Sequence, residues 1–168
     1  MPQTHPSHEH ALFARFIGDW VGDERVAATE FGPAGTAHAR MSFHTVADGM
    51  FLFVYYVEDV GPGVIGHGMI GFDKKRGVYT LHWFDNAGMP SSTIATAPAN
   101  GDDLAFEADY GWHLGRTVFN AGDSELRFRI EMQKPEHERV VVVEAVLAKI
   151  DAGSTIEDAR GSSTLRSR

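Results

Sequence analysis

The sequence predicts an all-β fold, an antiparallel up-and-down barrel of about ten strands with a short N-terminal helix. Short segments rich in β-branched and aromatic residues recur along nearly the whole chain. Clusters of Gly, Asp and Asn separate these segments at short, regular spacing. No long crossover connection interrupts the series, and direct hairpins favour up-and-down closure over a Greek key.

The clearest hairpin lies in the middle of the chain. The segments Val64–Phe72 and Val78–Phe84 flank the charged turn Asp73–Gly77. A second turn, Asp85–Gly88, follows at once, so the next segment must also fold back. This unit indicates an antiparallel meander.

The other elements follow from the same reasoning. Ser7 can cap a short helix that ends at Gly18, and its apolar stripe suits a lid over one mouth of the barrel. The remaining expected strands are Trp20–Ala28, Thr36–Ala47, Met50–Glu58, Ser92–Ala97, Leu104–Asp109, His113–Asn120, Glu125–Gln133 and Arg139–Ile150.

Composition sets limits on the class of protein. The 168 residues suit one domain, here residues 8–151, with flexible segments at 1–7 and 152–168. A net charge of −8 argues against broad binding to nucleic acid or to an anionic membrane. With no cysteine there is no disulfide, thiolate nucleophile or cysteine-ligated metal. No secretory signal or membrane-spanning stretch is visible, so a cytoplasmic location is expected.

Several motifs resemble known barrel families. Gly18-Asp19-Trp20-Val21-Gly22, after a short helix, resembles the calycin barrels, namely the lipocalins, fatty-acid-binding proteins and nitrobindin. The pieces Asp48–Leu52, Gly68–Asp73 and Trp83–Gly88 resemble a bacterial lipocalin-like family of unknown function. The resemblance covers roughly residues 11 to 149. It implies a calycin-type barrel, but fold does not fix function.

The resemblance also bears on haem. Nitrobindin-like relatives bind haem through an axial histidine near the C-terminal strand. Here Arg139–Ile150 contains no histidine, and the nearest is His137, in the preceding turn. No cofactor is therefore expected.

Polar residues on apolar strand faces are the candidates for a ligand site. If Trp20 points inward, as the resemblance implies, Glu24 does too. Arg116 lies between Leu114 and Val118, and an interior Arg holds the ligand carboxylate in the fatty-acid-binding relatives. Arg116 is thus the expected polar anchor. The other candidate ligand-binding residues are Met41, Phe43, Phe51, Phe53, Tyr55, His67, His82 and Trp83.

Plainer interpretations stand beside these. Arg116 can instead pair with an acid, or its face can point outward. Glu24 and Glu144 meet only if the first and last strands bring them together. The alternating faces His38–His44 and Arg127–Arg129 are typical of a solvated exterior.

Two sets of histidines are candidate metal ligands. His5, His8, His10 and Glu9 could chelate a metal in the N-terminal segment, but positions two apart do not share a helical face. His67, His82 and His113 could converge from different strands, but no spacing rule supports this. No metal is expected.

The expected function is non-covalent binding of a small, largely apolar ligand, including one that bears a carboxylate. One alternative is a haem protein or a small-molecule enzyme that uses the same cavity, with Glu24 or His67 as general base. No nucleophile paired with a base is visible, so enzymatic activity is left open but not favoured. Another alternative is a filled barrel that binds a partner. Apolar residues on both faces of Met50–Val57 and Val140–Leu147 favour a homodimer.

Overall fold

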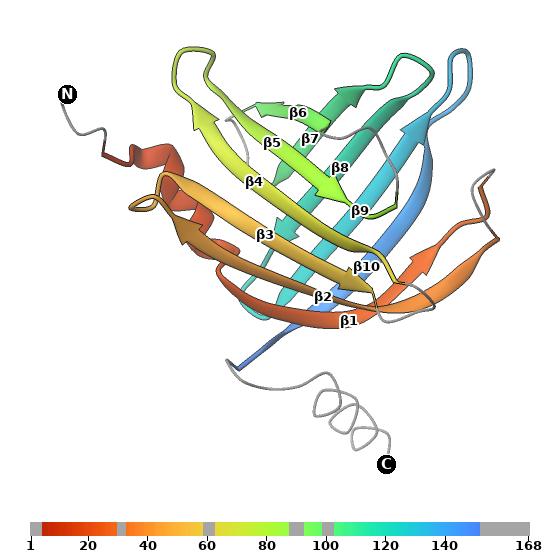
Figure 1. Ribbon diagram of the computed structural model, residues 1–168, viewed down its shortest axis with the longest axis horizontal. Helices are drawn as coiled ribbons and strands as arrows, with labels where there is room; N and C mark the ends of the chain where they lie inside the picture. Colours follow the sequence, from red (N-terminus) through yellow and green to blue (C-terminus); the bar gives the residue numbers. More distant parts are fainter. Residues whose placement is uncertain (1–4, 30–32, 59–62, 88–92, 99–102, 152–168) are drawn as a thin grey trace.

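Pairing between the first and last strands closes the sheet into a barrel (Figure 1). The computed structural model describes residues 5–29, 33–58, 63–87, 93–98 and 103–151. Within them the elements are η1 (His8–Arg15), β1 (Gly18–Val26), β2 (Gly35–Val46), β3 (Phe51–Glu58), β4 (Ile65–Asp73), β5 (Val78–Asp85), β6 (Thr93–Pro98), β7 (Leu104–Asp109), β8 (Leu114–Ala121), β9 (Glu125–Gln133) and β10 (Val140–Ile150).

Every strand pairs with its neighbours in the chain, and β1 also pairs with β10. All pairings are antiparallel. The β1–β10 seam runs from Asp19 opposite Ile150 to Val26 opposite Val143. Closure leaves the sheet no open edge, which removes unpaired backbone groups. The ten-stranded up-and-down barrel predicted from the sequence is confirmed.

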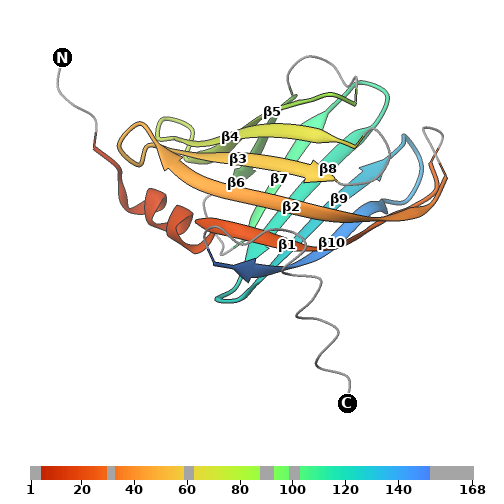
Figure 2. The same ribbon diagram turned by 60° about the horizontal axis from the view of Figure 1, so that its bottom comes forward.

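The helix η1 closes one end of the barrel (Figure 2). It is a 3-10 helix, and its side chains Phe13 and Phe16 are fully buried. The indole N–H of Trp20 donates to the carbonyl of Phe16 at 2.8 Å, and the hydroxyl of Tyr79 donates to the carbonyl of Glu9 at 2.8 Å. The first bond satisfies a carbonyl that the C-terminal end of the helix leaves unpaired, and the second ties the first turn of η1 to β5. The predicted lid is therefore present.

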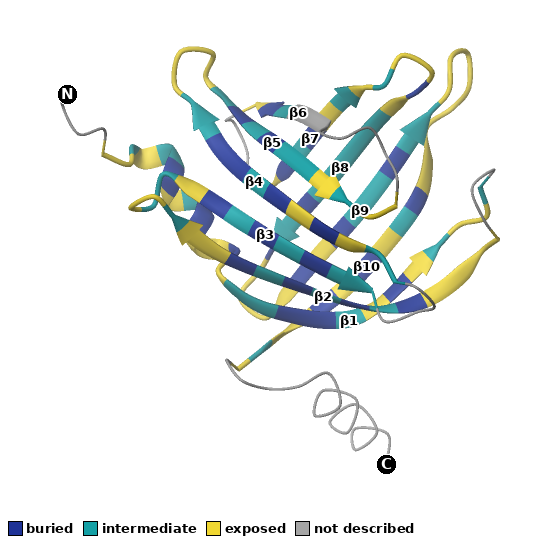
Figure 3. Cartoon of the chain, in the orientation of Figure 1, coloured by how far each residue is buried: buried dark blue, intermediate teal, exposed yellow. Residues whose placement is uncertain are grey.

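Side chains alternate between the barrel interior and its exterior along the strands (Figure 3). On β2, Ala39, Met41 and Phe43 face inward, and on β3, Leu52 and Val54 do. A continuous aromatic and aliphatic core results. Its burial supplies the main driving force for folding.

The β4–β5 turn shows how local sequence sets the hairpins. The Asp73 carboxylate accepts bonds from the backbone N–H groups of Lys75 and Arg76, at 3.0 and 3.1 Å. Gly77 has φ +67°, a conformation that glycine adopts without strain, and its N–H donates to the Asp73 carbonyl at 2.8 Å. The turn predicted at Asp73–Gly77 is confirmed.

Two expectations concern the chain ends. The C-terminal segment 152–168 and residues 1–4 lie outside the described residues, so their predicted flexibility stays a prediction. Among the described residues, no helix is long and apolar enough to cross a membrane.

Candidate functional site

The barrel interior differs between its two ends. At the η1 end, the inward side chains Leu52, Ile70, Leu126 and Leu147 are fully buried. At the opposite end, where β3 and β5 finish and β8 begins, several inward side chains are only partly buried. These are Glu58, Trp83, Asp85, Thr117 and Ile130. The interior is thus fully enclosed at the helix end, whereas part of its lining is exposed at the other end, which we call the open end.

A cluster of three polar side chains lies in the interior at this open end. Glu24 on β1 is fully buried, and Tyr56 on β3 is nearly so. The Tyr56 hydroxyl lies 2.9 and 2.8 Å from the two carboxyl oxygens of Glu24. It lies 2.6 Å from Oε1 of Glu58, two residues along the same strand face. We call these three residues the acid cluster.

The acid cluster must share protons. The Tyr56 hydroxyl has one proton, yet its oxygen is within hydrogen-bond distance of two carboxyl groups. One carboxyl can accept that proton, so the other must itself be protonated to donate to the hydroxyl oxygen. A buried pair of carboxylates with no second proton would repel each other.

Electrostatics agree with this proton count. Burial raises the pKa of Glu24 to about 8, and the hydrogen bond and negative charge of Glu58 act in the same direction, whereas the Tyr56 hydrogen bond lowers it. Burial and the two adjacent carboxyl groups also raise the pKa of Tyr56. At neutral pH the cluster therefore holds a neutral phenol and a protonated Glu24.

An aromatic side chain stands beside the acid cluster. The ring centroids of Trp83 and Tyr56 are 6.2 Å apart, and the Trp83 indole N–H donates to Oδ2 of Asp85 at 2.9 Å. The indole lies against β4 at two glycines. A Cβ on Gly66 would come within 2.3 Å of Trp83 Cζ2, and one on Gly68 within 2.9 Å of Cε3. The two glycines therefore make room for the ring.

Five of the sequence-predicted residues face the interior. Glu24 and Trp83 lie at the open end, within the candidate site. Trp20, Met41 and Phe43 are buried in the core at or toward the η1 end, where Phe16 packs against Phe43. They fill the barrel below the site and do not line its mouth.

Other predicted residues lie on the exterior. Phe51, Phe53 and Tyr55 alternate with the buried side chains Leu52, Val54 and Tyr56, so the expected inward face of β3 is corrected to the other face. His67 and His82 also point outward, opposite the buried Gly66, Gly68 and Leu81. The physical reason is that β3 is apolar on both faces, so its alternation does not reveal which face is buried.

Arg116 also lies outside the barrel. It shares a face with Val118, whereas the adjacent Phe119 is fully buried. Its guanidinium is 3.4 Å from Oε2 of Glu131 and 4.0 Å from Oε1 of Glu107. Arg116 is thus paired with acidic side chains on the outer face of the barrel, as the second of its two interpretations predicts. Glu144 is likewise exposed, so it does not meet Glu24, which stands opposite Ala145.

Sequence reasoning missed three residues of the site, Tyr56, Glu58 and Asp85. Glu58 and Asp85 end their strands next to turns, where a carboxylate is an ordinary turn residue. The available signal was the alternation Leu52, Val54, Tyr56, Glu58, but the alternate set Phe51, Phe53, Tyr55 is equally apolar.

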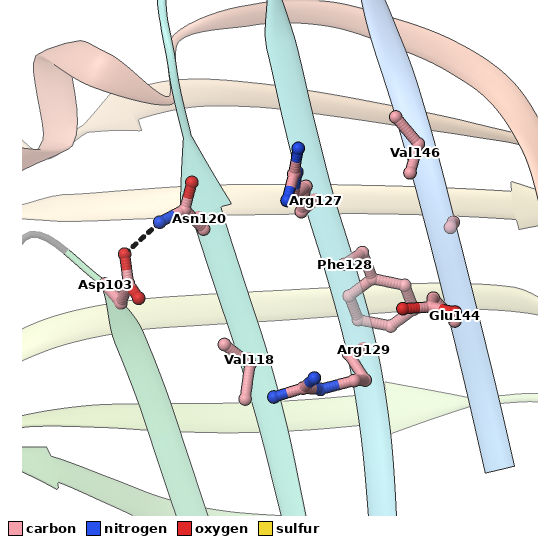
Figure 4. Close-up of a pocket in the computed structure, with 9 residues that line it drawn as sticks. Asp103, Val118, Asn120, Arg127, Phe128, Arg129, Glu144 and Val146 are labelled. Carbon is pink, nitrogen blue, oxygen red and sulfur yellow. Dashed lines mark hydrogen bonds between the residues drawn. The ribbon is translucent and has the colours of Figure 1, made fainter. Parts of the chain in front are cut away.

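A shallow depression of about 300 Å³ lies elsewhere, on the outer surface of β8, β9 and β10 (Figure 4). Arg127, Arg129, Asn120 and Glu144 are among its lining residues. Asn120 bonds to Asp103, and Arg129 pairs with Glu131 at 2.8 Å. Its two arginines thus pair with carboxylates outside the depression, and it lies on the opposite side of the strands from the acid cluster.

The described residues contain no group of three His, Asp or Glu side chains arranged to hold a metal. His67 and His82 lie outside the barrel, whereas His113 is buried at the β7–β8 turn, stacked on Tyr110 with ring centroids 4.6 Å apart. These histidines therefore do not converge. His5 and His8 precede or begin η1, and the Nδ1 of His10 accepts the Ser7 N–H at 3.0 Å.

Comparison with protein families decides the family. Residues 5–149 match the model of a family described as Protein of unknown function (DUF1579). The chain belongs to the DUF1579 family. No curated protein matches this DUF1579 member.

Solved structures show the same fold at low sequence identity. The crystal structure of Rv2717c from M. tuberculosis has a TM-score of 0.65 and 14% identity, covering 86% of this chain and 99% of that one. The S-type phycobiliprotein lyase CPES from Guillardia theta has a TM-score of 0.54 and 10% identity, covering 89% of this chain and 100% of that one. Both fit a calycin-like barrel, which supports the predicted resemblance at the level of fold. A specific likeness to lipocalins or nitrobindin stays a prediction.

Proposed function

We propose that the open end of the barrel binds a small, largely apolar molecule that presents a hydrogen-bond donor, such as an amine or a ring N–H, to the acid cluster. The observation that carries this proposal is the Glu24–Tyr56–Glu58 arrangement, with two carboxyl groups converging on one hydroxyl inside an otherwise apolar barrel. Burying such groups is costly, so a functional use is a natural explanation.

The surroundings of the cluster suit an apolar ligand body. Trp83, Tyr56 and Phe128 form an aromatic group, with the Tyr56 and Phe128 rings 5.9 Å apart. Further aromatic surface lies nearby, because the Trp83 ring covers Gly66 and Gly68 and the Tyr110 ring lies against Gly115. Binding sites typically combine apolar walls with a few convergent polar groups, as here.

The acids determine which polar group the ligand carries. Glu58 and Asp85 are partly exposed acceptors at the open end, and the buried Glu24 lies behind Tyr56. Carboxylates accept hydrogen bonds and attract cations. A ligand carboxylate would be repelled by Glu58 and Asp85, and Arg116, which could pair with it, lies outside the barrel. A ligand that bears a carboxylate is therefore not favoured.

The fold is compatible with such a role. A barrel of this size can leave room for one small ligand. The CPES protein, described as a phycobiliprotein lyase, shares this fold, which is consistent with a barrel that handles small molecules. At 10% identity, the likeness between the two chains is a likeness of fold.

Two matched probes test the proposal, nonylamine and nonanoic acid, which share an apolar chain and differ in the charge of the head group. Native mass spectrometry and thermal unfolding are measured with each probe. We expect nonylamine to form a one-to-one complex with an affinity at least about tenfold above that of nonanoic acid. Native mass spectrometry of the protein as purified from cells would show whether a ligand of a few hundred daltons accompanies it.

Variants locate the binding. Glu24→Gln/Glu58→Gln should remove the preference for the amine, whereas Glu138→Gln, at an exposed position, should retain it. If neither probe binds and the purified protein carries no ligand, the ligand-binding proposal is wrong and the filled-barrel alternative gains support. If both probes bind equally and the double variant changes nothing, the acid cluster does not recognise the ligand.

A further inference from the structure

The outer faces of the two sides of the barrel have opposite character. On β8, on β9 and just before β10, side chains form a network of ions in which Glu131 pairs with Arg116, Arg129 and Arg139 at 3.4, 2.8 and 3.6 Å. On β3, β4 and β5, no outward side chain is charged from Phe51 to Val57, from Ile65 to Gly71 or from Thr80 to Phe84. We call this second face the uncharged wall.

The uncharged wall exposes apolar surface. Phe84 is 49% exposed and Ile65 40% exposed, and the two lie on adjacent strands. Tyr55 and Phe53 contact His67, with ring centroids 5.2 and 5.8 Å apart. A solvated antiparallel face ordinarily carries polar and charged side chains, so the wall has the character of a surface that is covered by a partner.

We propose that the uncharged wall is the interface of a homodimer, in which it packs against the same wall of a second copy. Like charge opposes self-association least on this wall. Each copy carries a net charge of −8, so two copies repel each other at most orientations. A two-fold dimer places identical patches together, and only a patch without like charges can do this without cost. A negatively charged membrane is disfavoured by the same net charge.

The size of the wall sets the expected strength of the dimer. The three strands of the wall, β3 to β5, with about seven residues each, cover roughly 330 Å² in projection from standard strand spacings. That is well below the roughly 800 Å² per partner that a standard specific interface buries. We therefore expect a dimer that dissociates in the micromolar range.

Met69 marks the centre of the wall, because it stands between Phe53 on β3 and His82 on β5. The natural chain has no cysteine, so a single introduced cysteine can form a disulfide only with its copy in another molecule. Met69→Cys should therefore form a covalent dimer under mild oxidation, whereas Val146→Cys, exposed on β10, should not.

Sedimentation equilibrium of the full chain over about 1–200 μM, where such dimers dissociate, tests the assembly without cysteine. We expect a shift from the 18.4 kDa monomer to twice that mass. Phe84→Asp should weaken the dimer at least about tenfold, because it places a charge against its own copy, whereas Val146→Asp should leave the dissociation constant unchanged. Circular dichroism of both variants shows that the barrel is folded.

Two outcomes overturn the proposal. One is a monomer at every concentration, in which case binding to neutral phospholipid vesicles would show that the wall faces a membrane instead. The other is a dimer that Phe84→Asp leaves unchanged and Met69→Cys does not cross-link, which would place the interface elsewhere. Neither outcome depends on the ligand site, because the wall and the acid cluster lie on opposite sides of the sheet.

Discussion

Glu24 is a carboxyl group in the interior of a barrel, held by a hydroxyl and a second carboxyl group. Its pKa of about 8 in the folded protein exceeds the ordinary value of 4.5 that it has in the unfolded chain. The folded state therefore binds the proton more tightly. The stability that this proton contributes is fully present below about pH 4.5 and is lost as the pH rises through about 8.

This linkage gives a prediction for stability against pH. The free energy of unfolding should fall between pH 5 and pH 8, by at most about 1.4 kcal/mol per pH unit for this one group. Glu24→Gln should have a flatter dependence, because the amide does not titrate, and Glu138→Gln should keep the slope of the natural protein. Urea unfolding at several pH values measures this. Equal slopes for all three proteins would show that Glu24 is not the titrating group.

Tyr56 gives a second prediction at the residue scale. Tyr56→Phe removes the hydroxyl that both carboxyl groups contact, and it should destabilise the barrel by about 1–3 kcal/mol at pH 7, the usual cost of leaving a buried polar group without a partner. Tyr55→Phe is the matched control, because the adjacent side chain faces outward. It should change the free energy of unfolding by no more than about 0.5 kcal/mol. A similar loss in both variants would contradict the importance of the cluster.

At the scale of the strands, β4 and β5 fit together through glycine. Trp83 covers Gly66 and Gly68, and an added Cβ at Gly66 would overlap the indole ring. This close contact within the β4–β5 hairpin fixes the position of Trp83 in the candidate site.

Gly66→Ala should therefore displace Trp83 and destabilise the protein by about 1–3 kcal/mol, the typical cost of overpacking. Gly35→Ala is the control, because nothing lies within 4 Å of its added Cβ. Near-ultraviolet circular dichroism reports the tryptophan environment, and urea unfolding reports stability. The packing argument fails if Gly66→Ala leaves both measurements as they are in Gly35→Ala.

At the scale of the whole molecule, one core runs through a closed sheet. The β1–β10 seam joins the first and last strands of the sheet, and η1 covers one end of the same core. We expect urea unfolding followed by tryptophan fluorescence and by far-ultraviolet circular dichroism to give superimposable curves with one midpoint. A fluorescence transition at lower urea would show that part of the barrel opens separately.

The strand positions could be predicted from the sequence because turns are encoded locally. Asp73 and Gly77 form their turn through bonds within five residues. The interior face of β2 was also predictable, since Ala37, Ala39, Met41 and Phe43 alternate with polar residues. The inward orientation of Glu24 was predicted from the resemblance, which places Trp20 inside the barrel, because both side chains lie on the same face of β1.

The acid cluster could not be predicted to the same depth. Glu24 and Tyr56 are 32 residues apart, and they meet only because the register of β2, with Ala37 opposite Glu24 and Met41 opposite Tyr56, places both side chains inside the barrel. The inward face of β3 depends on this register, because its two faces are almost equally apolar. Arg116 shows the same limit, since apolar neighbours in the sequence do not reveal which side of a strand faces the core.

The turns, the strands and the closed meander follow from the sequence alone, because they depend on local backbone preferences and on alternation over a few residues. The folded barrel is needed to show which face of each ambiguous strand is buried, which acids share a proton and which outer wall is uncharged. These depend on strand register and barrel closure, which bring together residues far apart in the chain and set the dielectric environment around them.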